Sequence, residues 1–422
     1  GSKVFLKRGS NFSGCFNTKG SGTPDKQNML ATYGKGPKPV INSTGGATVS
    51  LNNIECWTIQ DIELAGGDMG CIVRMQDFGT ARNIKLLRLD IHDINGGTVG
   101  DNSGILCIHS GETTIFDGLL IEGCTITHAD RNGILITDYP NATDKHRSKN
   151  VVIRGNKLTD IGGDGIFILA CKGAVIEKNI MRYAHQRVGR NPGERACAGI
   201  WPHRSENTLV QFNEVTHTAV GGKTIWESEG LDDDISCTGS IFQYNYSHDN
   251  AGGFMLFCGG KDSIFRYNVS VNDNTATFTF ETNETKNIQI YNNTVYVKDG
   301  LDVNLIRNTF GTPQNVVFSN NIFYVEGKSK YLSGNMKDIS FDHNVFYGNI
   351  IKHPTDMNAI TSDPMLINPT KYGNGFDTLG GFKLKNTSPC IDAGQTIKYN
   401  SSRDFWGVRL TGKTDIGACE AK

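Results

Sequence analysis

The sequence predicts an all-β fold, a single-stranded right-handed parallel β-helix of roughly eleven rungs with a C-terminal cap. An apolar residue, two variable residues and an asparagine recur along the chain, 23 to 34 residues apart. Each copy holds two or three short β-rich runs separated by Gly, Asn or Asp, and helical periodicity never exceeds two turns. The recurring asparagines are Asn156, Asn179, Asn213, Asn245, Asn268, Asn293, Asn321 and Asn344, and Gln60, Leu89 and Cys124 take the equivalent earlier places.

The recurring asparagine has a physical role in such a stack. A strand-only repeat of this length buries its apolar residues only against neighbouring copies. At a tight corner an asparagine tolerates the left-handed conformation, and its amide can bond the asparagine one rung away. We therefore expect Asn213, Asn245, Asn268 and Asn293 to stack at one corner.

The ends of the chain differ from its middle. Residues 1–50 should form the first turns, 51–350 the regular rungs and 351–422 a terminal cap that shields the last rung. Since no linker separates these parts, we expect residues 1–422 to form a single domain.

Composition narrows the function classes. The chain has 422 residues, 50 of them Gly, and a net charge of −1, which gives no reason to expect nucleic acid or an anionic membrane as a partner. No apolar run reaches the ~18 residues of a membrane span. The eleven cysteines lack metal-site spacing and should be small buried apolar residues. Whether Cys390 and Cys419 form a disulfide stays open.

Several segments carry a resemblance to a known family. YGKGPKPVI near the start, QYNYSHDNAGGF in the middle and SPCIDAG with DIGACE at the end resemble bacterial right-handed parallel β-helix proteins of the pectate-lyase-like superfamily, of Bacteroidetes type. The resemblance covers nearly the whole chain. It implies a carbohydrate-active protein: a lyase, a hydrolase, an epimerase or a protein that only binds glycans. We expect it to be secreted, periplasmic or on the cell surface, its signal peptide absent from this sequence.

Several predicted strands begin with a small residue, here called the opener, and aligning these openers predicts which side chains share a face. The residue after each opener should point inward and the next one outward. The expected inward column is Ile105, Ile134, Ile166, Ile200, Leu231, Phe254 and Thr277; the expected outward columns are Leu106, Leu135, Phe167, Trp201, Asp232, Met255 and Phe278, then Ile108, Thr137, Leu169, His203, Asp234, Phe257 and Phe280. Asp233 should point inward. Long insertions at 183–198 and 218–229 should wall a cleft over residues 199–281.

These columns select the candidate site residues. The expected catalytic residues are Asp232, Asp234, Glu227 and His203. The expected substrate-binding residues are Trp201, Arg204, Glu229, Trp226, His248, Asp249, Glu281, Lys223 and Arg187. The resemblance is what favours His248 and Asp249.

The leading hypothesis is a glycoside hydrolase acting on a complex poly- or oligosaccharide. Glycosidic hydrolysis needs a carboxylic acid to protonate the leaving oxygen and a carboxylate as nucleophile or base, without a metal or other cofactor. One alternative is a uronic-acid polysaccharide lyase with Lys223 as base and Ca²⁺ held by the aspartates. Another is a non-catalytic glycan-binding β-helix. The sugar and the oligomeric state stay open.

Overall fold

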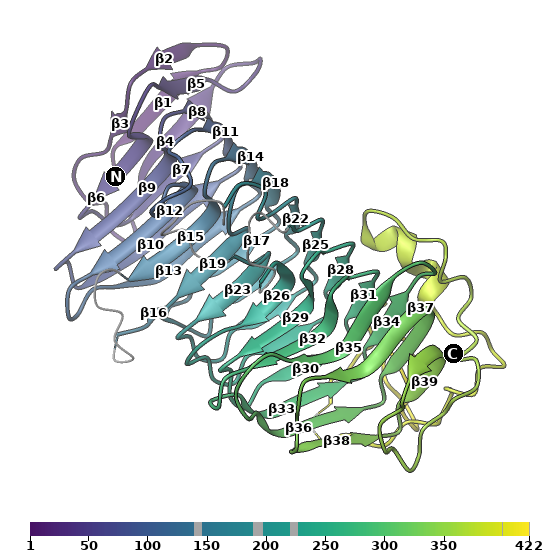
Figure 1. The fold of residues 1–422 in the computed structure, drawn as a ribbon. Coiled ribbons are helices and arrows are strands. Elements are labelled where there is room, and N and C mark those ends of the chain that lie inside the picture. The colour runs from purple at the N-terminus through teal and green to yellow at the C-terminus, as the bar shows by residue number, and fades with distance from the viewer. Residues whose placement is uncertain (139–145, 189–196, 220–226, 399, 422) are drawn as a thin grey trace. The chain divides into compact units, whose positions relative to one another are not determined.

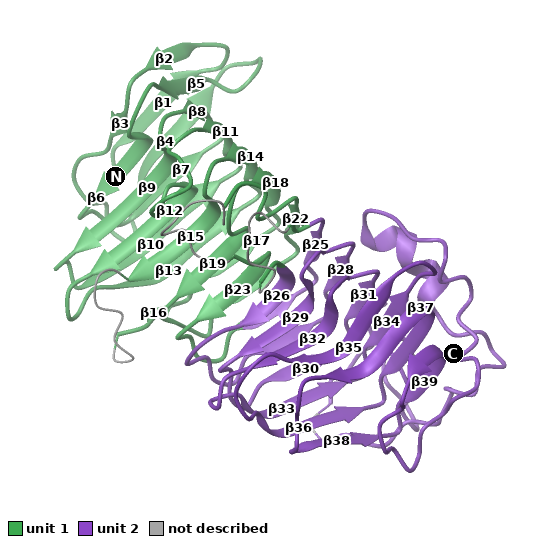
Figure 2. Cartoon of the chain, in the orientation of Figure 1, with its two compact units in different colours: residues 1–208, 218–228 green, residues 209–217, 229–422 purple. Residues whose placement is uncertain are grey.

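The computed structural model describes residues 1–138, 146–188, 197–219, 227–398 and 400–421. The chain divides into two compact units, residues 1–208 with 218–228 and residues 209–217 with 229–422 (Figure 2). Each unit is a ladder of short parallel strands (Figure 1). The single domain with its three segments stays a prediction.

Unit 1 contains three sets of stacked strands. The first set is β1 (Lys3–Lys7), β4 (Asn28–Tyr33), β7 (Trp57–Gln60), β10 (Thr80–Leu87), β13 (Ile115–Glu122), β17 (Val152–Arg154) and β21 (Val175–Glu177), with β16 (Ser148–Lys149) and β20 (Cys171–Lys172) beside it. The second is β2 (Asn11–Ser13), β5 (Val40–Ser43), β8 (Glu63–Gly66), β11 (Asp90–Ile94), β14 (Thr125–Ala129), β18 (Lys157–Ile161) and β22 (Ile180–Arg182). The third is β3 (Phe16–Asn17), β6 (Ala47–Asn52), β9 (Met69–Gln76), β12 (Ser103–Ser110), β15 (Asn132–Asp138), β19 (Ile166–Leu169) and β23 (Ile200–His203).

Unit 2 repeats this pattern. Its first set is β24 (Leu209–Gln211), β27 (Ile241–Gln243), β30 (Ile264–Arg266), β33 (Lys286–Tyr291), β36 (Gln314–Ser319) and β38 (Ile339–Asp342). The second is β25 (Glu214–Thr216), β28 (Tyr246–His248), β31 (Val269–Val271), β34 (Thr294–Val297), β37 (Ile322–Ser333) and β39 (Val345–Ile351). The third is β26 (Glu229–Asp233), β29 (Gly253–Cys258), β32 (Ala276–Glu281) and β35 (Asp302–Asn308), which also pairs with β37. A 3₁₀ helix, η1 (Phe376–Phe382), follows in the C-terminal segment.

The asparagine ladder is confirmed. The side-chain oxygen of Asn245 accepts both the backbone N–H and the side-chain amide of Asn213, each at 3.0 Å. Asn268 does the same for Asn245, at 2.9 and 3.0 Å, and Asn293 for Asn268. These asparagines are fully buried, and buried amides must find partners. The ladder therefore fixes the stacking distance at this corner.

The left-handed conformation falls elsewhere than expected. It belongs to the residue before each ladder asparagine, as at Phe212, Tyr244 and Tyr267, with φ of 55°, 57° and 49°. A second left-handed residue lies four positions after the ladder residue. In chain order these are Asp93, His128, Asp160, Tyr183, His217, Asp249 and Asn272, with φ between 54° and 62°. Each short strand of the second set is thus bracketed by two sharp turns.

The predicted side-chain columns are correct in unit 1. Ile166 pairs with Ile200, Phe167 with Trp201 and Leu169 with His203. Ile105 and Ile134 pair in the same way on earlier rungs. Leu106 and Leu135 form an apolar stripe with Ile72, joined by the partly buried Phe167, separate from the interior column.

In unit 2 the predicted register is wrong by one residue between β26 and β29, whereas the predicted pairs Met255–Phe278 and Phe257–Phe280 are correct. Asp232 pairs with Leu256 rather than Met255, and Asp233 pairs with Phe257. Four residues predicted to point outward lie in the core instead and are 0 % exposed: Met255, Phe257, Phe278 and Phe280. The shift lies in β26, where Glu229 rather than Gly230 pairs with Gly253. The chain places Phe254 at the interior corner, where its ring lies 4.9 Å from that of Phe265.

All eleven cysteines are free thiols, so Cys390 and Cys419 are not bonded to each other, and ten are buried as expected. The exception is the exposed Cys15.

Within the described ranges, the chain has no helix with the length and apolar character required to span a bilayer.

Candidate functional site

Four carboxylates fall within the six positions 229–234, which comprise the acidic strand β26 and the residue after it. Leu231 and Asp233 face the interior, and alternation turns Asp232 to the outer side. Asp232 is nevertheless only 4 % exposed, so it is an outward side chain that is covered. Asp234 follows the last residue of the strand and is half-buried. It therefore belongs to the turn, not to the outward strand column predicted for it.

The inward position of Asp233 is confirmed. Its Oδ2 accepts a hydrogen bond from the Ser263 hydroxyl at 2.6 Å, and the residue is 0 % exposed. Burial raises the pKa of Asp233 to about 6, because a charged carboxylate is poorly solvated in the interior. Asp233 is thus a core residue that a substrate cannot reach.

The first carboxylate of β26 contacts an arginine that the sequence analysis did not select. Glu229 is fully buried, and its Oε1 lies 3.5 Å from Nη2 of Arg307. Arg307 lies in β35 and pairs with Thr279, which continues the column of Asp232 and Leu256. The arginine side chain therefore runs along the outer face of the third strand set, towards the acidic strand.

Glu281 lies at the end of β32 and is also buried. The Thr309 hydroxyl donates to its Oε1 at 2.5 Å, and the Cys258 thiol donates to its Oε2 at 3.7 Å. These contacts give Glu281 a structural role at the strand end, and its role in substrate binding stays a prediction.

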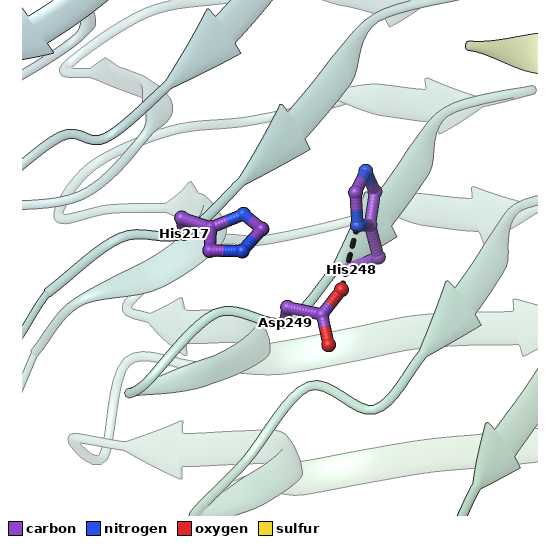
Figure 3. Close-up of side chains that lie close together, drawn as sticks. All are labelled: His217, His248 and Asp249. Atoms are coloured by element: carbon purple, nitrogen blue, oxygen red, sulfur yellow. Dashed lines mark hydrogen bonds and ion pairs between the residues drawn. The ribbon is translucent and has the colours of Figure 1, made fainter. Parts of the chain in front are cut away.

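A histidine cluster lies on the second strand set of unit 2 (Figure 3). His248 is buried, and its ring stacks on that of Tyr246 at 4.4 Å. Its Nδ1 donates to Asp249 at 2.9 Å, and its Nε2 lies 3.5 Å from Oε1 of Glu214. Burial alone would lower the pKa of His248, but hydrogen bonds to both carboxylates outweigh it and raise the pKa.

His217 completes this cluster and was missed in the sequence analysis. The signal was present, because the asparagine ladder aligns Asn213-Glu-Val-Thr-His with Asn245-Tyr-Ser-His-Asp. That alignment places His217 over Asp249 and Thr216 over His248. The pairing of Thr216 with His248 confirms it.

The aromatic residues of the candidate list lie in unit 1. Trp201 stacks on Phe167 with ring centroids 3.7 Å apart and planes inclined by 5°. His203 meets the Trp201 ring edge-on at 6.2 Å. A flat, half-buried indole of this kind is a suitable surface for a sugar ring.

Three further candidates also belong to unit 1. Arg204 lies at the end of the Trp201 strand, where its positive charge opposes the burial that raises the pKa of Asp138. Arg187 is held by Asp160 at 2.5 Å and by Asp130 at 3.6 Å, which makes it a structural cation. Glu227 is half-buried.

The predicted cleft stays a prediction. Trp226 and Lys223 lie outside the described residues, as do 189–196 and 220–226 of the two predicted walls. One groove that the structure does describe lies elsewhere in unit 2, between β33, β36 and residues 395–397.

Comparison with known proteins identifies the family. The sequence model of the protein family described as "Right handed beta helix region" matches residues 40–215 and 80–304. The chain therefore belongs to this family, and the predicted right-handed parallel β-helix is confirmed.

One curated relative is the lacto-N-biosidase of Bifidobacterium longum subsp. longum, 28% identical over 410 residues. The match covers 81% of this chain and 25% of the relative, so the chain spans about a quarter of that protein.

Solved structures agree on the fold. The native GH136 lacto-N-biosidase from Eubacterium ramulus has a TM-score of 0.58 at 21% identity, covering 80% of this chain and 62% of that one. Its selenomethionine derivative gives 0.60 with the same identity and coverage. XylC in complex with xylose gives 0.52 at 12% identity, covering 82% and 66%. At these identities the likeness concerns the fold alone.

Proposed function

We propose that this protein is a glycoside hydrolase acting on an oligosaccharide. The observation that carries the proposal is the end of the acidic strand β26, where Asp232 lies in the strand and Asp234 follows it, two residues further along the chain. Asp233 between them faces the core, and Glu229 at the other end faces Arg307. The two carboxylates fit the pair that glycosidic hydrolysis requires.

In this proposal one of the two aspartates protonates the leaving oxygen, and the other acts as nucleophile or as base for water. Arg307 supplies a positive charge on the same strand set, 3.5 Å from the carboxylate of Glu229. Independently of these residues of unit 2, Trp201 of unit 1 offers a stacking surface for a sugar ring. The mechanism uses no metal, so a chelator should leave turnover unchanged at temperatures where the protein stays folded.

The substrate class is proposed from the named relative. Because that protein is a lacto-N-biosidase, the first substrate to test is an aryl lacto-N-bioside, within a panel of plant and host oligosaccharides. A degrading role on such glycans fits a secreted, periplasmic or cell-surface location, which fractionation of the source cells would check.

One experiment separates the three function classes. The purified chain is incubated with the panel, and new reducing ends and the ultraviolet absorbance of unsaturated products are read in parallel. We expect new reducing ends without unsaturated products. Unsaturated products would indicate a lyase instead. Binding without any cleavage would indicate a glycan-binding protein, and either result would overturn the proposal.

A further inference from the structure

Three potential metal ligands converge on two adjacent rungs of unit 2. Nitrogens of His217 and His248 and a carboxylate oxygen of Asp249 all lie within 4.8 Å of one another. Figure 3 shows the His217 ring facing the space beside Asp249, while the dashed line joins His248 to that carboxylate. No step of the proposed hydrolysis uses this cluster.

The backbone sets this convergence. His217 and Asp249 each occupy the left-handed position four residues after a ladder asparagine, with φ of 57° and 54°. The backbone N–H of His217 donates to the carbonyl of His248 at 3.4 Å, which places one turn directly over the next. The two side chains are therefore held one rung apart.

His248 has the environment of a metal-bound imidazole. Ligating histidines commonly donate their second ring N–H to a carboxylate, which fixes the ring and its tautomer. Here Nε2 faces Glu214 at 3.5 Å, and the side chains of His248 and Glu214 are 2% and 1% exposed. The ring also stacks on Tyr246. This arrangement presents Nδ1 to Asp249 and His217, where a bound ion would replace the proton that Nδ1 shares with Asp249.

An oxygen of a fourth residue lies inside the cluster. The hydroxyl of Thr216 is 2.5 Å from Nδ1 of His217 and 3.1 Å from Nδ1 of His248. It already joins the two imidazoles, so their nitrogens are turned towards the same space. The presence of two imidazoles, those of His217 and His248, distinguishes this corner from the corresponding corner of unit 1.

Unit 1 offers a matched corner for contrast. His128 and Asp160 occupy the same left-handed positions, and their side chains bond at 2.7 Å. There the carboxylate already has a cation, because Arg187 binds Asp160. That corner combines one histidine with an arginine, whereas the unit 2 corner combines two histidines with a carboxylate.

We propose that His217, His248 and Asp249 bind one divalent transition-metal ion of the zinc type. Two imidazole nitrogens and one carboxylate oxygen match the donor set that Zn²⁺ accepts, with a fourth position left for water. Ca²⁺ prefers oxygen donors alone and is not expected here. The ion clamps two rungs near the C-terminal segment, because the Tyr246 hydroxyl donates to the carbonyl of Gly373 at 3.0 Å.

The test measures binding of Zn²⁺ alone to the full chain, freed of metal with a chelator, by calorimetry and by metal analysis after dialysis. We expect one ion per chain and a higher melting temperature with Zn²⁺ but not with Ca²⁺. His217→Ala and Asp249→Asn should each weaken binding by more than the roughly 10- to 100-fold that loss of a partner outside the ligand set costs. Glu214→Gln should weaken it less, because it only orients His248.

His128→Ala is the control and should bind Zn²⁺ like the wild type. His217 is partly exposed, so its variant should fold even where a change at the buried His248 does not. Absence of a one-to-one Zn²⁺ complex, or equal affinity in the wild type and the His217→Ala variant, would overturn the proposal. Hydrolase activity is not read here, so the two proposals fail or stand independently.

Discussion

The indole Nε1 of Trp201 donates a hydrogen bond of 2.9 Å to Oδ1 of Asp164. The same oxygen accepts the backbone N–H of Ala198, and the other carboxylate oxygen accepts from Arg131 at 3.1 Å. Asp164 is buried. A buried, fully engaged carboxylate therefore fixes the edge of the indole, while its face lies parallel to Phe167.

If this indole binds a sugar ring, Trp201→Ala should act mainly on binding. We expect KM to rise by about tenfold with little change in kcat, because a stacking surface is removed while the acid–base groups remain. Trp201→Phe keeps an aromatic face and should retain most of the affinity. A large fall in kcat with unchanged KM would contradict a binding role.

The proposed catalytic pair is tested by Asp232→Asn and Asp234→Asn. Each change should lower kcat by at least ~10²-fold, as loss of a general acid or base commonly does. Asparagine has nearly the shape of aspartate, so the melting temperature should stay near that of the wild type even at the covered Asp232. Full activity in both variants would refute the assignment.

The buried Asp233 predicts a dependence of stability on pH. Its pKa is raised from 3.8 to about 6 in the folded protein, so the folded state holds this proton more tightly than the unfolded state. Stability from this group is therefore greatest below pH ~4 and falls as the pH rises to ~6, by about 3 kcal/mol in total.

Asp233→Asn removes this titration and can still accept the Ser263 hydrogen bond. Relative to the wild type, the variant should gain stability as the pH rises from 4 to 7, measured as the free energy of unfolding in urea at a series of pH values. The exposed Asp299→Asn is the control. A constant difference between Asp233→Asn and the wild type would show that Asp233 does not titrate in this range.

The asparagine ladder predicts a stability effect without an effect on chemistry. Asn268→Ala leaves two buried N–H groups of Asn245 without their acceptor. We expect the free energy of unfolding to fall by at least ~2 kcal/mol, because unmet buried donors cost about 1–3 kcal/mol each. Chemical denaturation would measure this change. The exposed Asn315, which bonds Asn287 at 3.0 Å, should tolerate alanine with a much smaller loss.

The ladder was readable from the sequence because one residue type meets one physical requirement on every rung. The side-chain oxygen of Asn245 accepts the buried backbone N–H of Asn213, and that of Asn268 accepts the backbone N–H of Asn245. The register between β26 and β29 was not readable, because Gly230 is the obvious small residue to align with Gly253, although Glu229 is the residue that pairs with it.

The candidate site was predicted unevenly for a related reason. Asp232 and Asp233 were assigned to the correct faces, since strand alternation applies whichever residue they pair with. Arg307 was missed because its approach to Glu229 depends on the direction of a long side chain, which no repeat pattern encodes. His217 was missed although the ladder alignment contained it.

The ladder also separates chain length from scaffold geometry. Asn213 and Asn245 are 32 residues apart and Asn245 and Asn268 are 23 apart, yet the amide contacts are the same 3.0 Å. Nine additional residues thus leave the step between rungs unchanged. A segment between two ladder asparagines can therefore be exchanged for one of different length while the neighbouring rungs keep their positions. Exchange of such segments would change what the face binds without redesign of the core.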